Sequence, residues 1–293
     1  MPGVRRVAVV RNTHTCLGRP KIMSGSTPSV VVVGGGPAGC ATGVFTARYG
    51  LETTILDRGS SSLRRAAFVE NYLGFPAGID PETFYDLAHD HAREAGCDLV
   101  EDMVVEVTDA SEGFRVETQD DRVLDADFVV AATKYDWQYL DALPVDFVDD
   151  GEYEQFDSSL VEQDGATPLD GLYVAGPNAG VPDQVLVAAG HGAHVGRAII
   201  ADVRRADGYE GTFAEHYDWL RREENLTGEW ATRERWQEYL DDAPDAPDDD
   251  ELRERYIDDR FAKYLDEDER EERKRNAHRR LADHLDLGEE LTD

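Results

Sequence analysis

The fold is decided by the stretch "SVVVVGGGPAGCATGVFTARYGLETTILDRG", residues 29–59. The run "SVVVV" predicts a buried strand, the small residues after it predict a helix, and "TTIL" predicts a second strand. Gly34, Gly36 and Gly39 form the pattern G-x-G-x-x-G between the first strand and the helix. This order of strand, glycine turn, helix and strand is typical of a Rossmann-like unit that binds a dinucleotide.

Each glycine of the motif has its own physical reason. Gly34 permits the tight turn, Gly36 lets a pyrophosphate approach the backbone, and Gly39 lets the helix lie close to the strand. Asp57 ends the second strand about 20 residues later, where a carboxylate accepts hydrogen bonds from an adenosine ribose and repels a 2′-phosphate. Cys40 is interpreted as a packing residue. A Rossmann-like domain that has lost its ligand is the alternative.

The chain beyond this stretch alternates apolar strands with helical segments. The predicted strands are Val30–Val33, Thr53–Leu56, Met103–Val107, Phe114–Glu117, Phe128–Ala131 and Leu172–Ala175, and the predicted helices are Ala38–Tyr49, Pro81–Ala95 and Asp183–Val203. This alternation predicts an α/β fold around a parallel sheet, with a small antiparallel excursion between Met103 and Val129. Residues 135–168 are polar and poorly periodic, and are interpreted as a partly regular connector.

The composition shifts near residue 206, so we expect a Rossmann-like domain over 23–205 and an acidic helical region over 206–293. Aromatic and leucine residues at helical spacing predict amphipathic helices that pack on the α/β body or on another subunit. They are Phe213, Tyr217 and Leu220, then Tyr256, Phe261, Tyr264 and Leu265. The charge run "DEDEREERKRNAHRR" (266–280) predicts a solvated helix.

The charge balance is strongly acidic: 62 Asp and Glu against 30 Lys and Arg, for a net charge of −32. In dilute buffer such a chain repels itself, whereas molar salt shortens the Debye length to about 3 Å. We therefore expect a salt-rich cytoplasm, as in a halophile, with an acidic solvated surface without salt adaptation as the alternative. In either case we expect neither nucleic acid nor an anionic membrane as partner. No apolar run reaches the ~18 residues of a membrane helix.

The first 22 residues hold five basic residues and no acid. They predict a disordered extension or a misassigned start, with Met23 rather than Met1 as the initiator. The cysteines Cys16, Cys40 and Cys97 form no C-x-x-C pair. The sequence therefore predicts neither a dithiol centre nor a metal site.

Three later segments decide which dinucleotide is bound. "VENYLGFPAGIDPETFYDLAHDHAREAGCDLV" (69–100) resembles the E-N-x-x-G-F-P segment of the thioredoxin reductase family of flavoproteins. "FVVAATKY" (128–135) resembles the family's A-T-G strand, and "GLYVAGPNAGVPDQVLVAAGHGAHVG" (171–196) its closing segment, in which G-D leads to a helix beginning Q-A. The resemblance spans roughly 29–133 and 160–203, and it implies FAD lying extended along this domain.

The resemblance also implies a role for individual residues. The pyrophosphate would be cradled by Gly34, Gly36, Pro37, Ala38 and Gly39, the adenosine ribose would be held by Asp57, and the adenine would meet the backbone of Val104. On the flavin side, Asn71 would lie near the flavin and Thr133 under the cofactor. Gly176 would belong to the closing segment, and the flavin pyrimidine would face the N–H groups of Gln184, Val185 and Leu186. A helix N-terminus there stabilises the negative charge that a reduced flavin develops.

The sequence departs from the family in several places. Only residues 135–159 occupy the position of the family's inserted NADPH domain, and the C-x-x-C dithiol is missing. Pro177 replaces the aspartate of G-D, which in the family would hold the ribityl chain. Asn178 would supply part of that contact. Lys134 replaces the glycine of A-T-G, either as a solvated charge or as a partner of substrate or flavin. His191 and His194 are interpreted as packing residues, with proton transfer as the alternative.

We therefore expect an FAD-dependent oxidoreductase of the thioredoxin-reductase-like group. Its reductant would come from outside the chain, as NAD(P)H, ferredoxin or another redox protein. A non-catalytic FAD-binding module and an NAD-dependent dehydrogenase are the alternatives. The C-terminal helices are expected to cover the flavin ring or to form a homodimer. No residue set in the sequence predicts a catalytic nucleophile, an acid–base pair or a metal centre.

Overall fold

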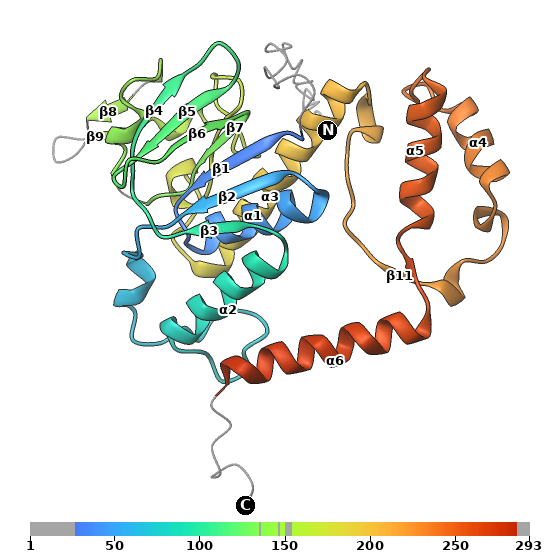
Figure 1. The fold of residues 1–293 in the computed structure, drawn as a ribbon, viewed down its shortest axis with the longest axis horizontal. Helices are drawn as coiled ribbons and strands as arrows, with labels where there is room; N and C mark the ends of the chain where they lie inside the picture. The colour runs from blue at the N-terminus through green and yellow to red at the C-terminus, as the bar shows by residue number, and fades with distance from the viewer. Residues whose placement is uncertain (1–26, 135, 146, 150–153, 286–293) are drawn as a thin grey trace, which may run out of the picture.

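The computed structural model describes residues 27–134, 136–145, 147–149 and 154–285. Its centre is a parallel sheet of five strands in the order β10-β7-β1-β2-β3 (Figure 1). The strands are β1 (Ser29–Val33), β2 (Glu52–Leu56), β3 (Asp98–Val100), β7 (Phe128–Ala131) and β10 (Leu172–Val174). This is the predicted α/β fold, and β3 is the one strand of the sheet that the sequence pattern did not predict.

The sheet is covered on both faces because successive side chains of its strands point in opposite directions. Val30 and Val32 pack against the layer of α1 (Pro37–Tyr49), α2 (Pro81–Glu94) and α3 (Val185–Asp207). Val31 and Val33 pack against the antiparallel sheet of β4 (Val104–Asp109), β5 (Phe114–Thr118) and β6 (Val123–Ala126). These four valines are almost fully buried, and each contributes roughly 1.5–3 kcal/mol.

The helices α1 and α3 cross at very short distance. A Cβ at Gly192 would lie 2.0 Å from the carbonyl oxygen of Ala38, and one at Gly196 would lie 2.8 Å from Cβ of Phe45. At the same crossing, Oγ1 of Thr42 donates a hydrogen bond of 2.9 Å to the carbonyl oxygen of Gly192. Small residues therefore allow the two helices to approach closely. Both helices begin at the carboxyl edge of the sheet.

The connector between β7 and β10 is partly regular, as predicted. Its described residues form the hairpin β8 (Phe147–Asp149) with β9 (Glu154–Phe156) and two short 3₁₀ turns, Gln138–Leu140 and Ser158–Leu160. The predicted extension over residues 1–22 lies outside the described residues.

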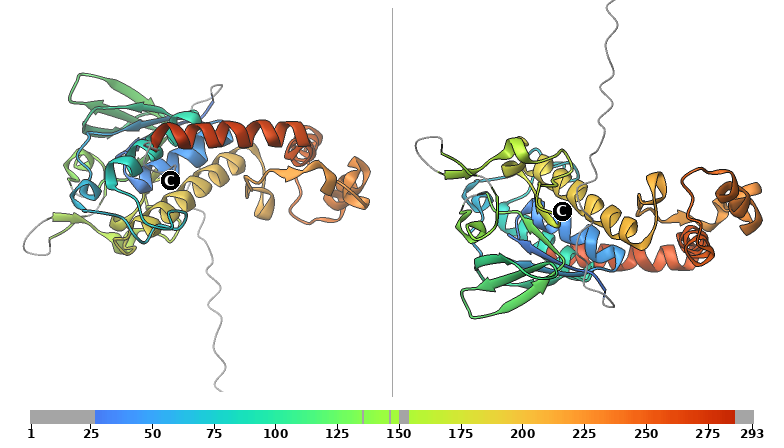
Figure 2. Two further views of the ribbon diagram at one scale, coloured as in Figure 1. Left: turned by 90° about the horizontal axis from the view of Figure 1, so that it is seen from below. Right: turned by 90° about the horizontal axis from the view of Figure 1, so that it is seen from above.

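The C-terminal region lies beside the far end of α3 and has its own apolar cluster (Figures 1 and 2). It contains α4 (Arg233–Asp242), α5 (Asp250–Phe261) and α6 (Glu267–His284), and a two-stranded pair of β11 (Arg221–Arg222) with β12 (Tyr264–Leu265). The cluster is formed by Tyr209, Phe213, Ala214, Leu240, Tyr256 and Ile257. Helix α3 runs on to Asp207, so the predicted boundary at residue 205 falls in its last turn.

The helix predicted through Phe213, Tyr217 and Leu220 is wrong. A 3₁₀ turn ends at Phe213, and residues 214–220 form no helix. The ammonium of Lys263 donates to the carbonyl oxygen of Tyr217, and Asp218 pairs with Arg48 of α1, so side chains from two other elements hold the segment out of a helix. Tyr217 and Leu220 are 51% and 43% exposed, so their spacing does not reflect burial.

The charged run folds into α6, which contains no buried residue, as predicted for a solvated helix. This helix returns to α2 (Figure 1), where Arg280 pairs with Glu94 and, at 3.4 Å, with Asp90, and Nε2 of His284 lies 3.1 Å from Asp90. Within the described part of the chain, no helix combines the length and the apolar character that a membrane crossing requires.

Candidate dinucleotide-binding site

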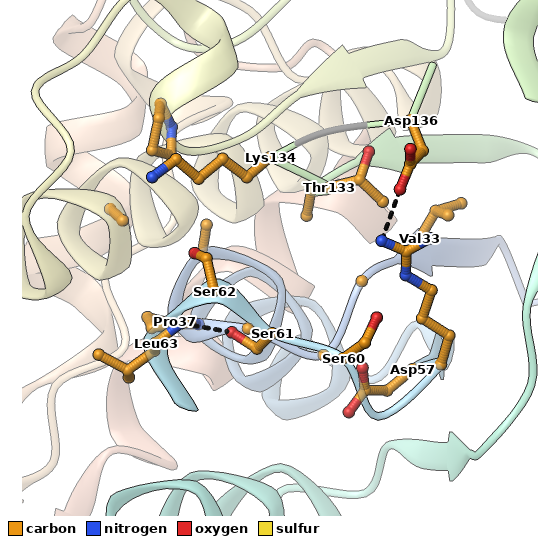
Figure 3. Close-up of a pocket in the computed structure, with 18 of the residues that line it drawn as sticks. Val33, Pro37, Asp57, Ser60, Ser61, Ser62, Leu63, Thr133, Lys134 and Asp136 are labelled. Carbon is orange, nitrogen blue, oxygen red and sulfur yellow. Dashed lines mark hydrogen bonds and ion pairs between the residues drawn. The ribbon is translucent and has the colours of Figure 1, made fainter. Parts of the chain in front are cut away.

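A cavity of about 730 Å³ lies at the carboxyl edge of the parallel sheet (Figure 3). Its walls come from the segments after β1, β2 and β7 and from the first turn of α3. The strand order changes direction between β1 and β7, and such a switch point is where open α/β sheets bind ligands. Figure 3 shows Thr133 and Lys134 facing Ser60, Ser61 and Ser62 across this cavity.

The glycine turn after β1 contains two kinds of glycine. Close packing requires glycine at some positions, and one position leaves open space beside the backbone. Gly34 has φ +115°, and a Cβ on it would lie 2.9 Å from the carbonyl oxygen of Ala132. A Cβ on Gly39 would lie 1.9 Å from the carbonyl oxygen of Gly34. A Cβ on Gly36 would have no atom closer than 3.6 Å, so no neighbour requires glycine there. The space at Gly36, at the N-terminus of α1, fits the approach of a pyrophosphate.

Tyr85 on α2 supplies a buried donor beside the same turn. Its side chain is 1% exposed, and among the described residues its hydroxyl makes no hydrogen bond of good geometry, although the Ser61 side chain lies close enough to affect its pKa. That hydroxyl lies 3.6 Å from the position of a Cβ on Gly36. Burial raises the pKa of Tyr85 to about 12, so the phenol keeps its proton at neutral pH. An unsatisfied buried hydroxyl is costly, and a ligand oxygen at the turn would satisfy it.

Asp57 follows β2 and is held by two groups that the sequence did not single out. A Cβ on Gly35 would lie 2.6 Å from Cβ of Asp57, so a residue with a side chain at position 35 would displace the acid. Nε2 of His89 lies 2.9 Å from the carbonyl oxygen of Gly35 and 3.5 Å from Oδ2 of Asp57. Next to Asp57, Arg58 pairs with Asp136 at 2.5 Å, and both residues line the cavity.

At the other end of the cavity, polar contacts join the loop after β7 to the loop after β10 and the start of α3. Oγ1 of Thr133 lies 3.0 Å from the hydroxyl of Tyr139, and the amide of Asn178 donates to the carbonyl oxygen of Thr133. The amide of Asn71 donates a 2.8 Å hydrogen bond to Oε1 of Gln184. The backbone at Thr133 and the N-terminus of α3 are thus held by side chains of the same site.

Most of the predicted site residues meet in the cavity wall. Those in the wall are Gly34, Gly36, Pro37, Ala38, Asp57, Asn71, Val104, Thr133, Gln184 and Val185. Gly39, Gly176 and Leu186 do not line it. Gly39 lies where α1 meets the glycine turn, Gly176 donates its N–H to Nδ1 of His191 at 3.0 Å, and Leu186 is exposed on α3.

The expectation that the C-terminal helices cover the cofactor is wrong for the described residues. Of residues 189–285, which the structure describes, none lines the cavity. The reason is that α4 and α5 pack around Tyr209 and Phe213, beyond the far end of α3 (Figure 2). The dimer expectation stays a prediction.

The remaining titratable candidates are structural. His191 accepts the Gly176 hydrogen bond, and burial lowers its pKa, so it acts as a neutral acceptor. His194 is exposed on α3 and does not line the cavity. Burial raises the pKa of both the Cys40 and Cys97 thiols to about 12, so neither forms a thiolate at neutral pH. The part of the chain that the structure describes contains no side-chain group suited to hold a metal.

Comparisons with known proteins agree with this geometry. Residues 11–192 match the family described as pyridine nucleotide-disulphide oxidoreductase. The chain is 27% identical to thioredoxin reductase from Rickettsia conorii over 116 residues, 39% of this chain and 37% of that protein. It is 33% identical to thioredoxin reductase from Bacillus subtilis over 85 residues, 28% of this chain and 27% of that protein. The chain thus spans about a third of these relatives' length.

Solved structures share the fold at low identity. A thioredoxin reductase from Gloeobacter violaceus matches with a TM-score of 0.51 and 18% identity, covering 66% of this chain and 98% of that one. The oxidoreductase from Agrobacterium tumefaciens matches with a TM-score of 0.53 and 13% identity, covering 63% and 100%. The chain thus shares the fold of these solved structures over about two thirds of its length.

The match over more than half of its residues places the chain in one family: it belongs to the pyridine nucleotide-disulphide oxidoreductases. This assignment confirms the expected oxidoreductase class and FAD as the cofactor. The residues present fit that cofactor, since the open space at Gly36 and the unsatisfied hydroxyl of Tyr85 lie together at the N-terminus of α1.

Proposed function

We propose that this chain is an FAD-dependent oxidoreductase whose flavin is reduced by a donor outside the chain. The observation that carries the proposal is the cavity, whose wall contains Asp57, Gly36 and Gln184 and therefore the N-termini of two helices. A wall with an acid after β2 and two helix N-termini suits a dinucleotide with a charged pyrophosphate between two flat ring systems. When bound, FAD supplies the two-electron chemistry.

Different residues of the cavity would bind different parts of the cofactor. The N-terminus of α1 and the Tyr85 hydroxyl would hold the pyrophosphate, and Asp57, kept in place by His89, would hold the adenosine ribose. Thr133 and Asn71 would contact the flavin half. The first N–H groups of α3, which have no side-chain cap, would face the pyrimidine ring.

The connector between β7 and β10 supports an external reductant. Its described residues form a small hairpin and 3₁₀ turns, with no second dinucleotide-binding unit among them. The reductant would therefore be a diffusing NAD(P)H, a ferredoxin or another redox protein that meets the flavin in a salt-rich cytoplasm. A homodimer through the C-terminal helices would leave this cavity open, since the described residues of that region do not line it.

A non-catalytic FAD-binding module is the second candidate, and the state of the cysteines favours it. Cys40 and Cys97 are buried with raised pKa values, so neither can pass electrons onward as a reactive thiol. In such a module the flavin would bind without turning over.

The two candidates separate in an anaerobic reductant screen. Protein purified in molar KCl should be yellow and should release FAD on denaturation. NADH, NADPH and reduced ferredoxin are then added separately, and bleaching of the flavin absorbance is followed. Fast bleaching by one of them supports the oxidoreductase, and bleaching by none supports the binding module.

A pair of glycine variants controls for the site itself. Gly36→Ala fills the open space at the turn and should weaken FAD binding at least tenfold. Gly190→Ala on α3 meets no atom within 4 Å and lies outside the cavity wall, so it should retain FAD as the unaltered protein does. Equal FAD loss in both variants, or colourless unaltered protein that takes up no added FAD, would contradict the proposed site.

A further inference from the structure

Lys134 and Asp183 form an ion pair inside the cavity wall, at the end where α3 begins. The ammonium of Lys134, in the loop after β7, contacts Oδ2 of Asp183. Asp183 directly precedes Gln184, the N-cap residue of α3, and all three residues line the cavity. Lys134 is the half-buried member of the pair, because its side chain is 27% exposed against 61% for Asp183. Figure 3 shows Lys134 in the wall beside Thr133.

We propose that Lys134 and Asp183 tune the reduction potential of the bound flavin in opposite directions. Lys134 raises the potential, and Asp183 lowers it while holding the lysine in place. The inference rests on the proposed function, because it takes the flavin ring to lie at the start of α3. Both side chains act as positioning and charge-tuning residues rather than as catalytic residues.

The physical reason is the charge that reduction creates. Two electrons from the external donor and one proton from solvent leave the flavin ring with one additional negative charge. A nearby ammonium favours the charged form of a neighbouring group, and a nearby carboxylate disfavours it. The N-terminus of the 23-residue α3 acts in the same sense as the ammonium.

Two other ion pairs of the described residues have a member in the wall, and both lie beside Asp57. Arg58, the next residue, pairs with Asp136, and Asp102, whose N–H donates to the carbonyl oxygen of Asp57, pairs with Arg122. Arg65 belongs to the turn after β2. The Lys134–Asp183 pair is therefore the ion pair adjacent to Gln184, where the pyrimidine ring is expected.

The experiment measures the midpoint potential of the FAD-loaded protein. Unaltered protein, Lys134→Met, Asp183→Asn and Lys134→Arg are titrated anaerobically with dithionite in the presence of redox mediators. Lys134→Met should make reduction about tenfold less favourable, which is a fall of about 30 mV for a two-electron couple. Asp183→Asn should raise the potential by a similar or smaller amount, and Lys134→Arg should leave it near the starting value.

The chain offers matched controls on α6. Lys274 and Glu271 form an exposed ion pair at 3.5 Å, remote from the cavity. Lys274→Met and Glu271→Gln remove the same charges as the test variants, so they report the effect of net charge alone. Their potentials should stay at the starting value.

The outcomes distinguish this inference from the proposed function. Shifts of opposite sign in the two test variants, with unchanged controls, support the inference. Shifts of the same sign, or FAD-loaded variants with unchanged potentials, overturn the inference and leave the proposed function standing. Unaltered protein that binds no FAD overturns both.

Discussion

The α/β body and the C-terminal region are stabilised by different kinds of contact. The body buries aliphatic side chains on both faces of a parallel sheet, and glycines bring its helices and turns together. The C-terminal region gathers aromatic rings around Phe213 and Tyr256, with arginines stacked on them and ion pairs at its surface. The body should therefore respond to changes in volume, and the C-terminal region to changes in charge, pH and salt.

One buried arginine joins the two regions. Arg204 on α3 is 3% exposed, and Nη2 of its guanidinium donates a 2.9 Å hydrogen bond to the carbonyl oxygen of Phe213. The guanidinium lies 4.1 Å from the ring centroid of Tyr209 and also contacts the hydroxyl of Tyr49 on α1. The junction thus combines a buried charge with aromatic rings from both sides.

The largest effect is expected for Gly39→Ala in the body. The new methyl group would lie 1.9 Å from the carbonyl oxygen of Gly34, so α1 would have to move away from the turn. We expect a loss of about 3 kcal/mol in the free energy of unfolding, together with loss of FAD. Urea unfolding followed by circular dichroism measures the first, and flavin absorbance measures the second. Gly190→Ala serves as the matched control, and a stable, yellow Gly39→Ala protein would contradict the packing described here.

The second largest effect is expected for Arg204→Met at the junction. The variant removes the donor from the buried carbonyl oxygen of Phe213, at a cost of about 2 kcal/mol. Trp236, which packs against the apolar cluster of the C-terminal region, should then become more exposed and the tryptophan fluorescence should shift to the red, while FAD stays bound. Arg205→Met is the matched control, because Arg205 is exposed next to it on α3. Simultaneous loss of FAD would show that the two regions do not unfold separately.

A third prediction concerns pH and His216, whose ring packs edge-on against Tyr49. Burial, with the nearby charges of Lys263 and Arg204, lowers the pKa of His216 to about 4. The unfolded chain takes up this proton as the pH falls below about 6.5, and the folded chain only near pH 4. The free energy of unfolding should therefore fall as the pH is lowered from about 6.5 to 4. The loss should be on the order of 2 kcal/mol after allowing for the partial exposure of the ring.

His216→Gln should remove this part of the pH dependence. The urea midpoint of the C-terminal region, followed by tryptophan fluorescence between pH 4 and 6.5, measures it. Burial also lowers the pKa of His91 and His191 in the body, so their contribution to the pH dependence of stability should persist in the variant. His278→Gln on the exposed face of α6 is the control. An unchanged pH profile in His216→Gln would count against a half-buried, neutral His216.

The smallest effect is expected for Arg280→Ala on α6. Arg280 joins α6 to α2 through Asp90 and Glu94, but the pair is exposed and contributes little. Faster hydrogen exchange of α6 should appear at moderate salt and vanish in molar KCl, where the Debye length is about 3 Å. Arg279 donates a hydrogen bond to Asn276 of its own helix rather than to α2, so Arg279→Ala should show no change at either salt concentration. A large effect that persists in molar KCl would mean that α6 is held by more than charge.

The same contrast explains how much the sequence could predict. The body follows local rules, so the strands near Val30 and Phe128, the glycine turn and Asp57 were all predicted from spacing. Strand β3 was missed because its three residues carry too short a pattern. Tyr85 and His89 were missed because only the crossing of α2 brings this face of the helix to the glycine turn.

The C-terminal region was predicted less well because its residues are placed by distant partners. The spacing of Phe213, Tyr217 and Leu220 suggested a helix, yet Arg48 and Lys263 hold the segment in another conformation. Long-range contacts of charged side chains leave no periodic trace in the sequence.

The close crossing at Gly192 has a geometric consequence for the cofactor. Because α1 and α3 touch backbone to backbone there, the interval between their first turns is fixed by the protein before any ligand arrives. The crossing therefore fixes the distance between the N-terminus of α1 at Gly36 and the N-terminus of α3 at Gln184. A molecule that reaches both helix N-termini would gain the attraction of both helix dipoles, and a shorter molecule would gain that of only one.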